Sequence, residues 1–162
     1  MGHKHSNYSE KANARMELLR RVAGFGATKQ DLKEIYFLFV RSHLEQSATV
    51  WHSSLTQENR DDLERVQKTA CKVILQDKYK SYKKALIQLE IETLENRREE
   101  LCLKFANKCL KNKKLKEMFP LNNKNHLMDI RKSEKYQVGF AHNERLKNSS
   151  IIYMQRLLNQ NE

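Results

Sequence analysis

The chain has 162 residues, of which 31 are Lys or Arg and 20 are Asp or Glu, so its formal net charge is +11. Only four Gly and one Pro interrupt a composition rich in helix formers, which predicts an all-α chain with one domain, or one domain with an appendage. No apolar run approaches about 18 residues and the first residues lack a hydrophobic signal segment, so we expect neither a transmembrane nor a secreted protein.

The first predicted helix runs from about residue 9 to residue 22. Its apolar stripe has the i, i+4, i+7 spacing of one helical face and consists of Ala12, Met16 and Leu19. Residues 1–8 are expected to fray. Their two histidines lack a second ligand pair at metal-site spacing, so we expect no metal there.

A Gly-Phe-Gly segment at 24–26 separates this helix from the second, and either glycine is suited to the left-handed conformation that ends a helix. Thr28 and Asp31 have the spacing of a capping box, so the second helix is predicted to begin there and to run to Trp51. Its section 35–40 is apolar nearly all round, which predicts the most buried helix of a bundle.

The third predicted helix, 56–75, has the clearest start and the best periodicity in the chain. Thr56 is the expected N-cap, and Asp61-Asp62 lies in the first turns, where carboxylates favour the positive end of the helix dipole. Trp51, the only Trp, is expected to be buried at the corner before this helix. Three helices with short connections predict a compact antiparallel bundle. The apolar stripe of the third helix consists of Leu63, Val66, Ala70, Val73 and Ile74.

The second half of the sequence predicts further, shorter helices. Ser81 is the expected cap of a helix over 82–89, and Thr93 that of a helix to about residue 112, which together form an added helical layer. Residues 120–148 are polar and basic without a clean period, which predicts a segment that is extended, and loose unless it docks on another part of the protein. Ser149 or Ser150 begins a final amphipathic helix, which is too short to be stable alone and is expected to pack on the body or on a partner.

The basic balance of the chain favours polyanionic partners, either nucleic acid or an acidic membrane surface. Within 104–116 six lysines occur without an acidic residue, which predicts a polyanion contact surface; an ordinary solvated helix face is the alternative. The three cysteines, Cys71, Cys102 and Cys109, lie within helical patterns. Their odd number indicates reduced core residues of an intracellular protein, nuclear or cytoplasmic, rather than a disulfide framework.

The order of these segments resembles the C-terminal part of reverse transcriptases from non-LTR (LINE-type) retrotransposons, which comprises the thumb and the helical segment after it. The resemblance covers nearly the whole chain. Many relatives have Pro and Tyr at the positions of Ser42 and Gln46. This difference leaves the family resemblance standing but leaves the type of retrotransposon open. The matching segments are KANARMELLRRV at 11–22, VRSHLEQSATVWHSSLT at 40–56, LERVQKTACKVIL at 63–75 and LENRREELCLKFANKCLKN at 94–112.

The resemblance implies a three-helix, thumb-like bundle over 1–80, a helical extension over 81–119, and an irregular basic segment over 120–162 that ends in a short amphipathic helix. The family places its metal-binding aspartates in a palm that precedes the thumb. We therefore expect a non-catalytic chain without cofactor or metal, in which Asp61-Asp62 stabilises a helix start.

In function, the resemblance implies a fragment of an RNA-directed DNA polymerase, or a transposon remnant, that grips an RNA–DNA or DNA duplex through phosphate contacts. A palm from the parent polymerase is a second expected partner, and no small-molecule substrate or membrane is expected. The alternative is a helical protein–protein interaction module without nucleic-acid binding, which docks through the second helix or the final helix. The candidate phosphate contacts are Lys11, Arg15, Arg20 and Arg21 on the first helix, supported by Lys29 and Lys33, and Lys104, Lys108, Lys111, Lys113, Lys114 and Lys116 in the basic cluster.

Overall fold

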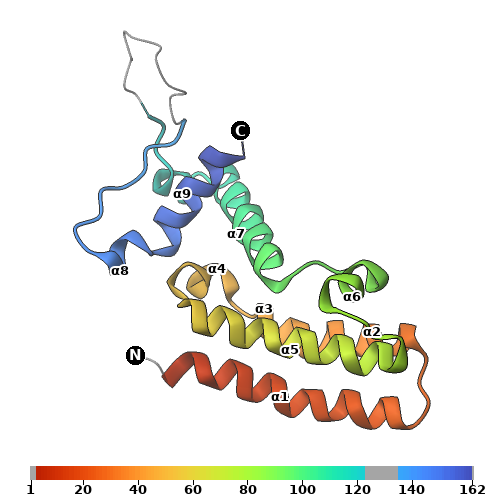
Figure 1. The fold of residues 1–162 in the computed structure, drawn as a ribbon. Helices are drawn as coiled ribbons and strands as arrows, with labels where there is room; N and C mark the ends of the chain where they lie inside the picture. Colours follow the sequence, from red (N-terminus) through yellow and green to blue (C-terminus); the bar gives the residue numbers. More distant parts are fainter. Residues whose placement is uncertain (1–2, 123–134, 162) are drawn as a thin grey trace. The chain divides into compact units, whose positions relative to one another are not determined.

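The computed structural model describes residues 3–122 and 135–161, with the side chains of residues 3–13 left out (Figure 1). Within these ranges the chain is all-α and contains no strand, which confirms the predicted fold class. An isolated antiparallel bridge joins Leu121 to Tyr136.

The contacts within the chain divide it into two compact units. The first unit consists of residues 1–48 and 55–97, and the second of residues 49–54 and 98–162. The helix α7 (Leu94–Lys111) passes through the boundary between the two.

The first unit begins with α1 (His3–Gly24), which starts six residues before the predicted helix. The expectation that residues 3–8 fray was wrong, and they contain neither Gly nor Pro to end the helix earlier. Met16 and Leu19 of the predicted stripe are fully buried. Of the two candidate glycines, Gly26 has the positive φ of 82° that the turn after α1 requires.

The next helix, α2 (Lys29–Ile35), has the predicted capping box. The Thr28 hydroxyl accepts a hydrogen bond from the Asp31 amide, and the Asp31 carboxylate accepts one from the Thr28 amide at 3.1 Å. Both contacts are local, which is why four residues of sequence suffice to predict them.

The predicted second helix does not continue unbroken to Trp51. After α2 the chain forms a π-helix, η1 (Tyr36–Arg41), and then one turn of α-helix, α3 (Ser42–Glu45). Ser47 takes a positive φ of 55° and separates this turn from α4 (Ala48–Trp51). The long helix was predicted from apolar content alone, which does not reveal an interruption formed by residues other than Gly and Pro.

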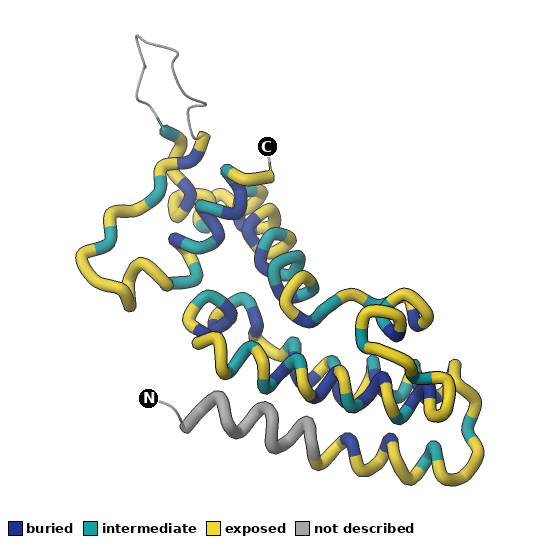
Figure 2. Tube along the Cα trace, in the orientation of Figure 1, coloured by how far each residue is buried: buried dark blue, intermediate teal, exposed yellow. Residues whose placement is uncertain are grey.

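The expectation that section 35–40 is the most buried helix was also wrong. Tyr36 and Val40 are fully buried on one edge, whereas Leu38 is 67% exposed and Phe39 is 46% exposed. Buried and exposed residues alternate along the helices of the first unit (Figure 2). A chain of this size buries only part of the surface of its helices.

The third predicted helix is confirmed as α5 (Gln57–Leu75), with the Thr56 hydroxyl accepting from the Asn59 amide. Leu63, Val66, Ala70 and Ile74 of its predicted stripe are buried. In Figure 1, α1, α2 and α5 lie side by side, and each packs against the other two.

A buried side-chain amide joins these helices to the rest of the unit. The Tyr36 hydroxyl donates to Gln67 Oε1 at 2.5 Å. Gln67 Nε2 in turn donates to the Tyr82 hydroxyl and to the Glu92 carbonyl oxygen, at 2.8 Å each. Gln67 therefore links η1, α5, the helix α6 (Tyr82–Leu89) and the connection that follows it.

The carboxylate of Glu64 extends this network by one step. It accepts from the Tyr82 hydroxyl and from the Leu94 amide, the latter at 3.1 Å. The Leu94 amide belongs to the first turn of α7, where amide groups have no partner within the helix. Glu64 thus caps α7 from a distant part of the sequence. The predicted cap, Thr93, is also present, because its hydroxyl accepts from the Asn96 amide at 3.2 Å.

In the second unit, α7 packs against α9 (Ser150–Gln160). The shorter elements are the 3-10 turns η2 (His52–Ser54) and η4 (Leu115–Met118) and the helix α8 (Glu144–Lys147); another 3-10 turn, η3 (Gln76–Lys78), lies in the first unit. The core of the second unit consists of Cys102, Ala106, Cys109, Phe119, Tyr136, Met154, Leu157 and Leu158.

Two polar side chains of α9 hold the segment that was expected to be loose unless it docks. Gln155 accepts from the Gly139 amide at 2.9 Å and donates to the Met118 carbonyl oxygen at 2.8 Å. Asn159 accepts from the Tyr136 amide at 2.9 Å and donates to its carbonyl oxygen at 3.0 Å. Tyr136 and Gly139 are therefore docked on α9, which is the condition under which the segment was expected not to be loose. Its part at 123–134 lies outside the described residues.

The residues around Trp51 also belong to the second unit. Trp51 is buried, as predicted, and the Arg98 guanidinium lies 6.0 Å from the centroid of its ring. Arg98 Nε donates to His52 Nδ1 at 3.3 Å, and the His52 ring meets Tyr153 edge-on at 5.5 Å. The three cysteines of the chain are free and buried.

Replacement of Gln67 tests the importance of its network. Gln67→Leu keeps the volume of the side chain but leaves the Tyr36 and Tyr82 hydroxyls and a carbonyl oxygen without this partner. We expect the free energy of unfolding to fall by about 2–4 kcal/mol, measured by urea denaturation. Gln57→Leu is the matched control, because Gln57 is exposed on the same helix, and it should change stability by less than about 0.5 kcal/mol.

The stability of the first unit should also depend on alkaline pH. Burial, aided by the negative charge of Glu64, raises the pKa of the Cys71 thiol from 9.0 to about 12, and burial raises the pKa values of Tyr36 and Tyr82. The folded protein therefore retains protons that the unfolded chain releases, so its stability is lost as pH rises from about 9 to about 12.

Urea denaturation at pH 8 and pH 10 measures this effect. Cys71→Ala and Cys71→Ser both remove the titrating thiol, and each should reduce the alkaline loss of stability by about 1 kcal/mol, whatever its own stability at pH 8. An unchanged loss in both variants would contradict the assignment to Cys71.

Candidate nucleic-acid interface

Arg15 and Arg20 of α1 do not lie in one stripe. By helical geometry, Arg15 and Arg20 point about 140° apart around the helix. Arg15 is engaged within the first unit, because its Nη1 donates to the Phe39 carbonyl oxygen at 3.0 Å. Lys11 lies in α1, and its side chain is outside the described ones.

One carboxylate partly neutralises the other two arginines of α1. Glu17 pairs with Arg20 at 3.5 Å and with Arg21 at 3.4 Å. All three side chains are at least half exposed, so these pairs are weak and screened by salt. The arginines remain accessible to a polyanion, but they would have to exchange Glu17 for a phosphate.

The two lysines near the start of α2 contact the last turn of α6 and the residue that follows this helix. Lys29 Nζ donates to the Gln88 carbonyl oxygen at 3.0 Å, and Lys33 Nζ lies 3.9 Å from the Glu90 carboxylate. Both contacts join segments far apart in the sequence. These lysines therefore have a structural partner that the sequence did not indicate.

The lysines of α7 form a continuous surface. Lys104, Lys108 and Lys111 follow one another at intervals of four and three, so they lie within about 60° around the helix. All three are exposed, and Lys104 pairs with Glu100 at 2.7 Å.

The turn after α7 continues this surface. Asn112 Oδ1 accepts from the Lys114 amide at 3.0 Å and from the Leu115 amide at 3.2 Å, which orders the chain between α7 and η4. Lys113, Lys114 and Lys116 are exposed there. We call Lys104, Lys108, Lys111, Lys113, Lys114 and Lys116 the lysine face.

The lysine face is nearly free of neutralising charge. Among the residues that the structure describes, no carboxylate lies within 4.0 Å of the ammonium groups of the lysine face other than that of Glu100. Several of these lysines stand in or just after the last turn of α7, where the helix dipole favours positive charge. The described candidates thus differ. Arg15 donates to a backbone carbonyl oxygen, Arg20 and Arg21 share one carboxylate, and the lysine face is largely unpaired.

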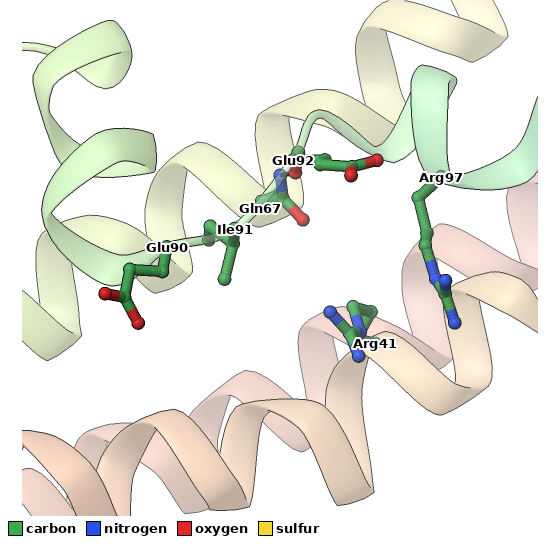
Figure 3. A pocket seen from close by; sticks show the side chains of 6 residues that line it. All are labelled: Arg41, Gln67, Glu90, Ile91, Glu92 and Arg97. Atoms are coloured by element: carbon green, nitrogen blue, oxygen red, sulfur yellow. Dashed lines mark hydrogen bonds between the residues drawn. The ribbon is translucent and has the colours of Figure 1, made fainter. Parts of the chain in front are cut away.

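A small pocket of about 190 Å³ lies elsewhere in the first unit (Figure 3). Arg41 and Arg97 line one side of it, and the connection after α6, with Glu92, lines the other together with Gln67. Sequence reasoning did not find this pocket, because its residues come from four separate segments and carry no motif.

The arginines of the pocket are held by one carboxylate. Glu45, whose side chain is 15% exposed, lies 3.3 Å from Arg41 and 3.3 Å from Arg97. The Arg41 guanidinium also stacks on the Phe37 ring, 3.8 Å from its centroid. With Glu90 and Glu92 across the pocket, positive and negative charges are nearly balanced, which suits a structural ion-pair network better than an anion site.

The acidic pair of α5 makes local contacts only. Asp61 accepts from Gln57 Nε2 at 3.0 Å, and Asp62 pairs with Arg65 at 2.7 Å. Across the described part of the chain, no group of three or more His, Cys, Asp or Glu is placed to hold a metal ion.

None of the described helices is both long enough and apolar enough to cross a membrane. Comparison of the chain with protein-family models, curated proteins and solved structures found no match.

Glu45 and Glu17 each pair with two arginines, and comparing them tests whether the more buried carboxylate contributes more to stability. Glu45→Gln removes a charge from the nearly buried site and leaves Arg41 and Arg97 without their shared anion, so we expect a loss of about 1–3 kcal/mol in the free energy of unfolding. Glu17→Gln makes the same change at a side chain that is 52% exposed, and should cost less than about 0.5 kcal/mol. Equal losses in the two variants would contradict this reading of the Glu45 site.

Proposed function

We propose that this chain is a non-catalytic nucleic-acid-binding protein that grips a polyanionic strand or duplex through the lysine face. The observation that carries the proposal is the lysine face itself: six exposed lysines on one helix and the turn after it, paired with a single carboxylate. Phosphate contacts of this kind position a nucleic acid without reading its sequence.

The physical support is electrostatic. Like charges placed about 5–6 Å apart on a helix repel one another, and an isolated protein would gain stability from interspersed acids. A nucleic acid relieves the repulsion and releases its own condensed counterions, which supplies most of the free energy of non-specific binding. The formal charge of +11 adds long-range attraction for the same partner.

The resemblance to the C-terminal part of non-LTR reverse transcriptases supports a more specific form of the proposal. In that form, the chain is a thumb-like and post-thumb fragment that contacts a primer–template duplex, beside a palm of the parent polymerase. The chemistry would then belong to the palm, and the basic residues of α1 would serve as secondary contacts.

A second candidate function is supported by the exposed apolar side chains of η1. Leu38 and Phe39 are accessible on a helix that was expected to be covered, which is typical of a surface that docks on another protein. In this alternative the chain is a helical interaction module, and its positive charge serves solubility alone.

A salt titration separates the two functions. The triple variant Lys108→Gln, Lys111→Gln, Lys114→Gln removes three charges from the lysine face. We expect its affinity for a labelled duplex to fall at low salt, and the slope of log K against log salt to become shallower by about 3 if each lysine contacts a phosphate. Fluorescence anisotropy measures both quantities.

The control removes three charges from another exposed segment, through Lys78→Gln, Lys80→Gln and Lys83→Gln. This variant should retain most of the affinity and nearly the whole slope. Equal effects of the two triple variants would assign binding to net charge, and a wild-type protein that binds no duplex even at low salt would contradict the proposed function.

A further inference from the structure

We infer that Phe105, at the border of the lysine face, makes this surface a binding site for single-stranded nucleic acid, with an unpaired base stacked on its ring. The inference rests on the proposed function, because the lysines supply the phosphate contacts. It goes beyond that function by naming the form of nucleic acid that the surface prefers.

The position of Phe105 on α7 is the first observation. Cys102, Ala106 and Cys109 mark the buried face of the helix. Phe105 lies about 60° around the helix from Cys102 and about 60° from Lys108, between the core and the lysines. Phe105 is 45% exposed and does not belong to the core of the unit, and Lys108, three residues further on, is exposed as well.

The spacing along the helix is the second observation. Phe105 and Lys108 are three residues apart, and such pairs are neighbours on a helix surface, about 5–6 Å apart at their Cβ atoms. Lys104 and Lys111 flank this pair along the axis, one turn on either side of Lys108. An aromatic ring therefore lies next to a row of cations that can track a sugar–phosphate backbone.

The chemistry of the two groups selects the ligand. A phenyl ring offers an apolar face to any base, and base–aromatic stacking contributes about 1–3 kcal/mol per base, regardless of sequence. In a duplex the faces of the bases are covered by their neighbours, so only the phosphates reach a convex helix. In a single strand both the base face and the phosphate are available, and Phe105 with Lys108 can engage both.

The test compares three labelled ligands by fluorescence anisotropy at low salt: an oligothymidylate, an abasic strand of the same length and charge, and a duplex. We expect Phe105→Ala to weaken binding of the oligothymidylate about tenfold, and to leave the affinities for the abasic strand and the duplex unchanged. Phe105→Leu should behave like Phe105→Ala, because leucine restores apolar volume but not an aromatic face, and Phe105→Trp should keep or improve the affinity.

Phe25→Ala is the matched control, because Phe25 is 90% exposed in the turn after α1 of the first unit; it should change none of the three affinities. Equal weakening of all three ligands by Phe105→Ala and Phe105→Leu would show a structural role and overturn the inference, as would full affinity of both variants for the oligothymidylate. Either result leaves the proposed function standing if the wild type binds the abasic strand and the duplex. A wild type that binds none of the three ligands would overturn the proposed function, and with it the inference.

Discussion

The amide side chain of Gln67 is the group on which the first unit depends. It is fully buried, and each of its hydrogen-bonding partners comes from a different segment: a π-helix, a short α-helix and the connection that follows it. A buried polar group stabilises a fold only when it is satisfied, so this arrangement permits one relative placement of the four segments. Glu64 extends this network, because its carboxylate accepts a hydrogen bond from the Leu94 amide at the start of α7.

The distribution of charge follows a second constraint, the cost of burying unpaired ions. Arg41 and Arg97 are partly shielded from solvent, and they share the carboxylate of Glu45, whose side chain is 15% exposed. On the lysine face, water screens the ammonium groups and only Glu100 is close. A polyanionic partner would remove the repulsion between these lysines when it binds. A row of exposed, unpaired cations is therefore a stronger indication of a polyanion-binding surface than the same number of paired cations.

The features of the fold that sequence predicts well are those fixed within four residues. Thr28 and Thr56 cap their helices because the hydroxyl and its amide partner are neighbours in the chain. The exposure of Leu38 is different in kind, because it depends on what packs against the helix from elsewhere. The same applies to Gln67, which reads in the sequence as one polar residue in an otherwise amphipathic helix.

The basic residues of the candidate interface show the same difference between local features and features that depend on the fold. The lysine face was predictable because charge and helical spacing are local properties, whereas the engagement of Arg15 and Lys29 with backbone carbonyls requires the fold. The opposite side of α7 carries small buried side chains, including Ala106 and Cys109, so the core of this unit and its basic surface use separate residues of one helix. Because the two sets do not overlap, the lysines can be replaced without removing a side chain from the core of the unit.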